Sequence, residues 1–132
     1  MLVPLLLKSG YRVRVMGRSL DKLSCRPWAY DPNVELVQAD MLNLHSLEKA
    51  VRGCWAAFYL VHSMNVRGKD FARVDRDAAR HMVHAADSAG LSRIIYLGGL
   101  GKDDPNLSEH LRSRTEVARI LQSGGVATTF LR

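Results

Sequence analysis

Short β-branched and aromatic stretches alternate along the sequence with stretches whose apolar residues recur every three or four positions, and this alternation constrains the fold most. The strand-like stretches are residues 11–16, 34–39, 55–61, 93–97 and 126–131. The helix-like stretches are residues 43–53, 69–89 and 108–123, while residues 19–33 have room only for a short helix. Strands and helices in alternation form parallel sheets through right-handed crossovers. The sequence therefore predicts an α/β fold in which helices cover both faces of a parallel sheet.

The chain begins with a stretch that has the character of a helix end. Leu2, Leu5 and Leu6 share helical spacing, and Gly10 follows as a typical helix stop before the strand at residues 11–16. A helix that leads directly into a strand is normally the second half of a strand-helix-strand unit. We therefore expect Met1 to be an internal methionine and a first strand to precede this helix.

Two stretches make specific predictions about burial. Residues 55–61 (WAAFYLV) are almost continuously apolar, which is typical of a parallel strand covered on both faces. In the helix over residues 69–89, apolar residues form one face and charged residues form the opposite, solvent-facing one. The apolar face contains Phe71, Val74, Ala78, Met82, Ala85 and Ala89, and the charged face contains Arg73, Arg76, Asp77, Arg80 and Asp87.

Composition excludes several classes of protein. The length of 132 residues corresponds to one domain, residues 1–132, and no apolar stretch approaches the roughly 20 residues that span a bilayer. The net charge of +6 is spread evenly, without a basic tail or stripe, so we expect a solvated arginine-rich surface and no nucleic-acid partner. Cys25 and Cys54 lack metal-ligand spacing, and we expect reduced thiols, no metal site and a cytoplasmic location.

Ligands of doubly wound parallel sheets bind beyond the carboxyl ends of the strands. In this sequence those ends are residues 17–19, 40–41, 62–64 and 98–101. The segments YRVRVMGR, VELVQADM, WAAFYLVHSM, RIIYLGGLG and HLRSRTEVARIL together resemble the NmrA-like, atypical members of the short-chain dehydrogenase/reductase superfamily. The resemblance extends from Leu2 to Arg132. It implies a three-layer Rossmann-like domain with a doubly wound parallel sheet, present here in truncated form, that binds NAD(P).

In that family, a strand and a G-x-x-G-x-x-G turn precede the helix whose end the stretch from Leu2 to Gly10 would form. The glycines of that turn let the backbone approach the cofactor pyrophosphate. This sequence contains no such turn before that helix, and the glycines at 98–101 are no substitute because they follow a late strand and open a loop. We therefore expect weak NADPH binding by the chain as given. We also expect much of the family's substrate pocket to lie beyond Arg132.

The resemblance places the rest of the dinucleotide site at the strand ends. Arg18 stands where NAD-preferring proteins have a carboxylate, and its guanidinium suits a 2′-phosphate, so NADP is expected more than NAD. Asp40 and Met41 match the pair that borders the adenine. The strand end beneath the cofactor ribose and nicotinamide corresponds to Leu60, Val61 and His62. The alternatives are a solvated loop arginine for Arg18 and a hydrogen-bonded histidine at the edge of the core for His62.

The resemblance also indicates where catalytic residues would lie. Ordinary members of the superfamily use a serine after the fifth strand and a Tyr-x-x-x-Lys on the next helix. The matching positions here are glycines 98 and 99 and the segment from His110 to Arg114, so the orienting hydroxyl is missing. His110 and Arg114 are four residues apart and would share one helix face. In a catalytic role, His110 would transfer a proton and Arg114 would donate hydrogen bonds to the cofactor ribose. The alternatives are a first-turn histidine and a solvent-facing arginine, and Tyr96, inside its strand, is not expected to replace the tyrosine.

Two functions follow from the resemblance. The first is an NAD(P)H-dependent oxidoreductase that acts on a small carbonyl or quinone-like substrate, and the second is a non-catalytic dinucleotide-binding redox sensor or scaffold. Without the first strand, the strands at residues 11–16 and 55–61 would have open edges. We expect these two strands to pair directly and the helix at residues 2–9 to be poorly anchored. We also expect the chain to self-associate through open sheet edges.

Overall fold

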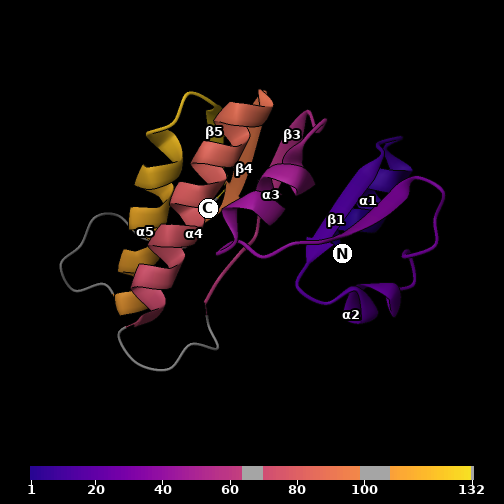
Figure 1. Ribbon diagram of the computed structural model, residues 1–132, viewed down its shortest axis with the longest axis horizontal. Helices are drawn as coiled ribbons and strands as arrows, with labels where there is room; N and C mark the ends of the chain where they lie inside the picture. Colours follow the sequence, from indigo (N-terminus) through magenta and orange to yellow (C-terminus); the bar gives the residue numbers. More distant parts are fainter. Residues whose placement is uncertain (64–69, 99–107, 132) are drawn as a thin grey trace. The chain divides into compact units, whose positions relative to one another are not determined.

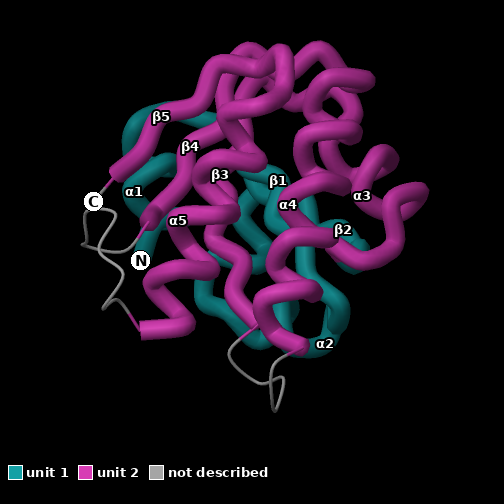
Figure 2. Tube along the Cα trace, turned by 90° about the vertical axis from the view of Figure 1, so that its left-hand side faces the viewer, with its two compact units in different colours: residues 1–40 teal, residues 41–132 magenta. Residues whose placement is uncertain are grey.

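The computed structural model of the chain describes residues 1–63, 70–98 and 108–131 (Figure 1). The chain is divided into two compact units, which Figure 2 colours separately. Unit 1 comprises Met1–Asp40 and unit 2 comprises Met41–Arg132. No helix in the described ranges is both long and apolar enough to cross a membrane.

Unit 1 is a small two-stranded parallel sheet with short helices. Its elements are α1 (Leu2–Lys8), β1 (Val13–Gly17), α2 (Leu20–Ser24) and β2 (Val34–Gln38). Val13 pairs with Val34, and the register continues to Gly17 and Gln38. Gly10 ends α1 with φ of 85°, a conformation that glycine adopts without strain, so the predicted glycine stop is confirmed. No residue of α1 is buried, which agrees with the expected weak anchoring of this helix.

Unit 2 is a three-stranded parallel sheet with three helices. Its elements are α3 (Leu44–Val51), β3 (Ala56–Tyr59), α4 (Asp70–Ala89), β4 (Arg93–Leu97), α5 (Glu109–Gln122) and β5 (Ala127–Leu131). The strand order is β3-β4-β5, and α4 packs against both α3 and α5 (Figure 1). Asn43 and Ser108 are the N-terminal capping residues of α3 and α5. Their side-chain oxygens accept hydrogen bonds from backbone N–H groups in the first turn of each helix. The predicted α/β fold with parallel pairing is confirmed.

The two faces of the unit 2 sheet differ in burial. Because Tyr59 pairs with Tyr96 and Tyr96 pairs with Phe130, these aromatic side chains share one face, and Tyr59 and Tyr96 are buried. Phe58 lies on the other face and is 37% exposed, and Leu60 beyond it is 47% exposed. The prediction that residues 55–61 are covered on both faces was therefore wrong. An apolar sequence is compatible with burial of a strand on both faces, but it does not determine whether a helix covers the second face.

The expected direct pairing of β1 with β3 was also wrong. The sheet of unit 1 contains β1 and β2, whereas the sheet of unit 2 contains β3, β4 and β5. Within the chain, α2 packs on β1 and β2, while α3 packs on α4. Each half of the chain therefore forms a parallel sheet of its own, and among the described residues β1 and β3 belong to different sheets.

The segment after α5 packs closely against α4 in unit 2. A Cβ added at Gly124 would lie 2.7 Å from Val83 Cγ1, whereas a Cβ at Gly125 would meet Asp87 Oδ1 at an ordinary 3.5 Å. Asp87 Oδ1 also accepts a hydrogen bond from the Gly125 N–H at 3.1 Å. Arg76 Nη1 on α4 lies 3.2 Å from Glu116 Oε2 on α5. Asp87 is exposed, as expected, and Arg76 is half-buried, and both also connect α4 to its neighbours.

We predict that Gly124→Ala lowers the free energy of unfolding by about 1–3 kcal/mol, because valine is stiff and cannot move away from the added methyl group. The measurement is urea denaturation, with Gly125→Ala as the matched control that has little effect. Combining Gly124→Ala with Val83→Ala should destabilise less than the sum of the two single changes. Strict additivity in this cycle would contradict the packing described.

Candidate cofactor and substrate site

A pocket of about 280 Å³ lies where the carboxyl ends of β3 and β4 meet α4 and α5. Parallel strands place their carboxyl ends at the same edge of the sheet, which is where ligands of such sheets bind. The residues that line the pocket are Val61, His62, Ser63, Phe71, Asp75, Tyr96, His110, Arg114 and Val117. Four of the residues that the sequence singled out, Val61, His62, His110 and Arg114, are therefore brought together.

Three aromatic side chains of the unit 2 sheet pack against one another, and one of them lines the pocket. Tyr96 packs edge-on against Tyr59 at 5.7 Å and against Phe130 at 6.0 Å between ring centroids. The Tyr96 hydroxyl donates a long hydrogen bond of 3.4 Å to Arg114 O on α5. Burial raises the pKa of Tyr96, although the nearby Arg114 charge opposes this shift. Tyr96 therefore keeps its proton at neutral pH and presents a hydroxyl to the pocket, a contribution that sequence reasoning missed.

His110 lies at the rim of the pocket in the first turn of α5. Its ring stacks on Phe71 of α4 with centroids 4.6 Å apart and planes 24° from parallel. His110 is exposed, whereas Phe71 is 7% exposed, so the imidazole covers a buried phenyl ring and still reaches solvent. Arg114, one helical turn further along α5, is half-buried and also lines the pocket. Both residues face the same cavity, as their spacing of four predicted.

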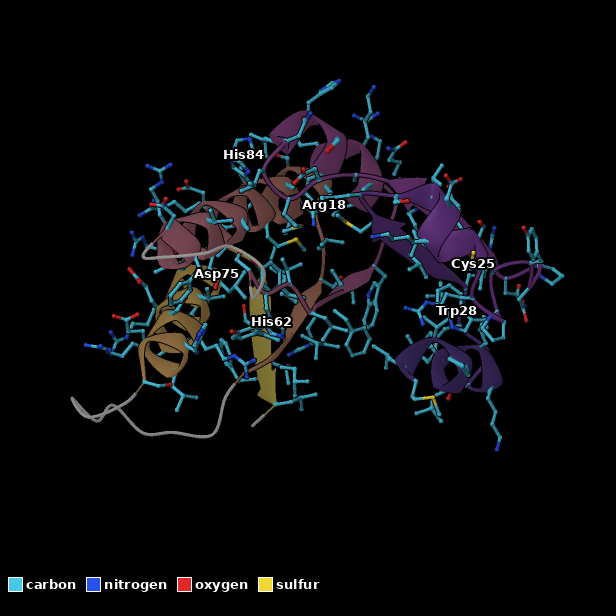
Figure 3. All side chains as sticks on the ribbon, turned by 90° about the horizontal axis from the view of Figure 1, so that it is seen from below. Arg18, Cys25, Trp28, His62, Asp75 and His84 are labelled. Carbon is cyan, nitrogen blue, oxygen red and sulfur yellow. The ribbon has the colours of Figure 1, made fainter. Side chains whose placement is uncertain are left out.

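Asp75 is the site residue that sequence reasoning missed entirely. It lies on α4, and Figure 3 labels it together with His62. Asp75 Oδ1 accepts a hydrogen bond from the Ser63 N–H at 3.0 Å, and Asp75 Oδ2 accepts one from Ser113 Oγ at 3.1 Å. The signal was present in the sequence, since position 75 lies four residues after Phe71 and three before Ala78, on the apolar face of the helix.

His62 follows β3 in the sequence, and its pKa differs from the ordinary value for histidine. Partial burial and the Arg114 charge lower the pKa of His62 below its ordinary value, while the Asp75 charge acts in the opposite direction. At neutral pH the imidazole is therefore predominantly neutral. The side chain is largely exposed at the pocket wall, which places it nearer the surface than a core histidine.

The other predicted cofactor residues lie outside the pocket lining. Arg18 is exposed in unit 1, where Gln38 Nε2 donates to Arg18 O at 3.0 Å, and Asp40 ends the same unit. Met41 is buried in unit 2, and its carbonyl oxygen lies 2.6 Å from His81 Nδ1. Leu60 is exposed and is not part of the lining. Their roles toward a cofactor stay predictions.

Of the three glycines at 98–101, only Gly98 is among the described residues, and Gly99 and Gly101 lie outside them. The Gly98 N–H donates to Leu131 O at 2.9 Å, so Gly98 continues the pairing of β4 with β5. Within the described ranges, no group of three or more His, Cys, Asp or Glu residues is arranged to hold a metal ion.

Comparison with known proteins gives the site a context. The sequence matches the NAD(P)H-binding family over residues 1–132. The structure is similar to an NADPH-dependent quinone oxidoreductase from Escherichia coli complexed with NADPH, with a TM-score of 0.79 and 22% identity, covering 99% of this chain and 43% of that one. A triphenylmethane reductase from Citrobacter sp. complexed with NADP(H) gives a TM-score of 0.71 at 21% identity, covering 90% of this chain and 39% of that one.

The enzyme WbmG from Bordetella bronchiseptica, in complex with NAD and UDP, gives a TM-score of 0.76 at 15% identity and covers 99% of this chain and 47% of that one. A search among curated proteins found no match. The chain thus spans less than half the length of each of these structures. At these identities the similarity shows the fold, and the expected Rossmann-like fold is confirmed.

Proposed function

We propose a function from one premise: the chain belongs to the NAD(P)H-binding family. The proposal is that it forms the cofactor-binding part of an NAD(P)H-dependent oxidoreductase that reduces a small carbonyl or quinone-like substrate. The observation that carries this proposal is the pocket at the strand ends, in which two imidazoles and a guanidinium lie beside aromatic rings. This set includes groups that can transfer the proton that reduction of a carbonyl requires.

Taken separately, each unit holds residues that suit one part of a dinucleotide. Arg18 offers an exposed guanidinium at the carboxyl end of β1, a suitable partner for a 2′-phosphate, which favours NADP. Arg114 offers a half-buried guanidinium to ribose hydroxyls, beside Val61 and His62. Asp40 and Met41 follow the second strand, where the adenine would lie. The sequence has no glycine-rich turn for the pyrophosphate.

NAD(P)H, when bound, supplies a hydride. In the proposed reaction His110 transfers a proton to the substrate oxygen, because its exposed ring exchanges protons with solvent and lines the cavity. Neutral His62 donates or accepts a hydrogen bond at the opposite wall. Tyr96 donates its hydroxyl hydrogen bond without ionising, because its pKa is raised.

The pocket also limits the size of the substrate. A volume of about 280 Å³ is at the low end of ligand pockets, which suits a small molecule. Phe71 and Tyr96 are almost fully buried behind the pocket, and the exposed aromatic surface is the His110 ring, which is held nearly parallel to that of Phe71. This ring favours a planar carbonyl or quinone over a bulky polar substrate.

One observation favours the second candidate function, a non-catalytic dinucleotide-binding sensor or scaffold. Glycines occupy positions 98 and 99, where ordinary superfamily members have the serine hydroxyl, and His110 and Arg114 occupy the places of tyrosine and lysine. Such a protein would bind the cofactor reversibly and would not turn over.

We predict that a panel of quinones and aldehydes includes a substrate that drives NADPH oxidation, measured as loss of absorbance at the nicotinamide band. His110→Ala should reduce the rate by about 10²–10⁴-fold, the usual contribution of a general acid. His45→Ala, which removes an exposed imidazole from α3, is the matched control and should retain the rate. Saturable NADPH binding without turnover on the whole panel would instead favour the sensor.

We predict that Arg18→Glu reverses the preference for NADPH over NADH. Losing one charge-assisted contact to a 2′-phosphate is worth roughly 1.5–3 kcal/mol, so NADPH affinity should fall by at least tenfold and NADH affinity much less. Arg12→Glu changes the same charge at the opposite end of β1 and is the control. Titrations followed by NMR measure even weak affinities, and equal losses for both cofactors would contradict this role.

We also propose self-association through open sheet edges. Within the described residues, β1 pairs only with β2 and β3 pairs only with β4, so each has one side without a strand partner. Exposed Phe58 and Leu60 add apolar surface beside β3. Sedimentation velocity should therefore show mass that rises with protein concentration, and Phe58→Lys should reduce it. Leu20→Lys, an equal change at an exposed leucine of α2, is the control, and a concentration-independent monomer would contradict the proposal.

A further inference from the structure

The Asp75 carboxylate joins three elements of unit 2. It belongs to α4, it accepts from the backbone N–H of Ser63 just beyond β3, and it accepts from the hydroxyl of Ser113 on α5. Ser113 is 4% exposed and is the one buried polar side chain among the described residues. Both carboxylate oxygens are therefore used, one on each side of the pocket.

The two partners of Asp75 are adjacent in sequence to residues of the proposed function. Ser63 directly follows His62, and Ser113 directly precedes Arg114. A shift of Ser63 would move the His62 side chain, and a shift of Ser113 would turn Arg114 relative to the cavity. The Asp75 carboxylate thus fixes the position of the segment that follows β3 relative to α5.

Charge gives Asp75 a second effect on the same pocket. The groups that face His62 are Asp75 from α4, Arg114 and His110 from α5, and Tyr96 from β4. Arg114 contributes a permanent positive charge, and Asp75 is the carboxylate among the lining residues. Replacing Asp75 by a neutral residue would leave that positive charge uncompensated beside His62.

We infer that Asp75 is a positioning residue, which holds His62 and Arg114 in place through Ser63 and Ser113 and offsets the Arg114 charge within the pocket. The inference rests on the proposed function only in assuming that the pocket binds cofactor and substrate. The hydrogen bonds and the charge balance belong to the chain itself, so they are testable without cofactor or substrate.

The decisive variant is Asp75→Asn in the full chain. An asparagine amide has the same shape, accepts from the Ser63 N–H through its oxygen and donates to Ser113 Oγ through its nitrogen. The charge is therefore lost while both contacts are kept, with the Ser113 hydroxyl changing from donor to acceptor. The pKa of His62, followed by NMR titration of its imidazole signal and assigned with His62→Gln, should fall further below its ordinary value. Arg114→Gln should shift the same pKa upward.

The matched control is Asp77→Asn, which removes the same charge two residues along α4. Asp77 Oδ1 accepts from exposed Arg80 and is not part of the pocket lining, so the pKa of His62 should not move. An unchanged or raised His62 pKa in Asp75→Asn would overturn the charge balance. Equal shifts in both variants would show a general charge effect and would overturn it as well.

Positioning is measured separately by amide hydrogen exchange at Ser63. Asp75→Ala removes the acceptor, and the Ser63 amide should exchange about tenfold faster, while Asp75→Asn should retain protection. Unchanged exchange in Asp75→Ala would overturn the positioning role. If neither variant folds, Asp75 is a residue of overall stability and the inference fails. Absence of detectable NADPH binding to the unmodified chain would contradict the proposed function and leave both readouts intact.

Discussion

Parallel pairing of β3 with β4 is the constraint on which the site depends. Parallel strands bring their carboxyl ends to one edge, and the connections between them must cross the sheet as helices. In unit 2 these crossovers are α4 and α5, and the pocket lies where their N-terminal halves meet the strand ends. The position of the cavity is therefore a result of topology, and the side chains at that edge decide its chemistry.

Register then selects which side chains support the pocket. Tyr59, Tyr96 and Phe130 pair across the strands on the covered face, so a one-residue slip of any of these strands would turn its aromatic ring to the other face. The Tyr59 hydroxyl is deeply buried, and burial together with the Asp75 charge raises the pKa of Tyr59. Both tyrosines thus stay neutral, and the ionised groups of the site come from the helices.

The sequence predicted the elements well because local rules decide them. The boundaries of β4 match the expected residues, and Ser108 begins α5 as its capping position indicated. Sequence could not predict strand pairing between distant segments, which is why β1 was wrongly paired with β3. It also missed Asp75, because a carboxylate on an apolar helix face is interpretable only when its partners, Ser63 and Ser113, are known to lie opposite it.

The exchange of tyrosine and lysine for histidine and arginine, which we propose for positions 110 and 114, has a consistent physical logic. A tyrosine acid near neutral pH needs a cation to lower its high pKa, whereas an imidazole already exchanges protons in that range. A guanidinium stays charged throughout, so Arg114 contributes a constant field. That field lowers the pKa of His62, and Asp75 limits the effect. Burial and the Arg114 charge thus lower the pKa of His62, and the Asp75 charge opposes this shift, so the acidity of His62 depends on residues from two neighbouring helices.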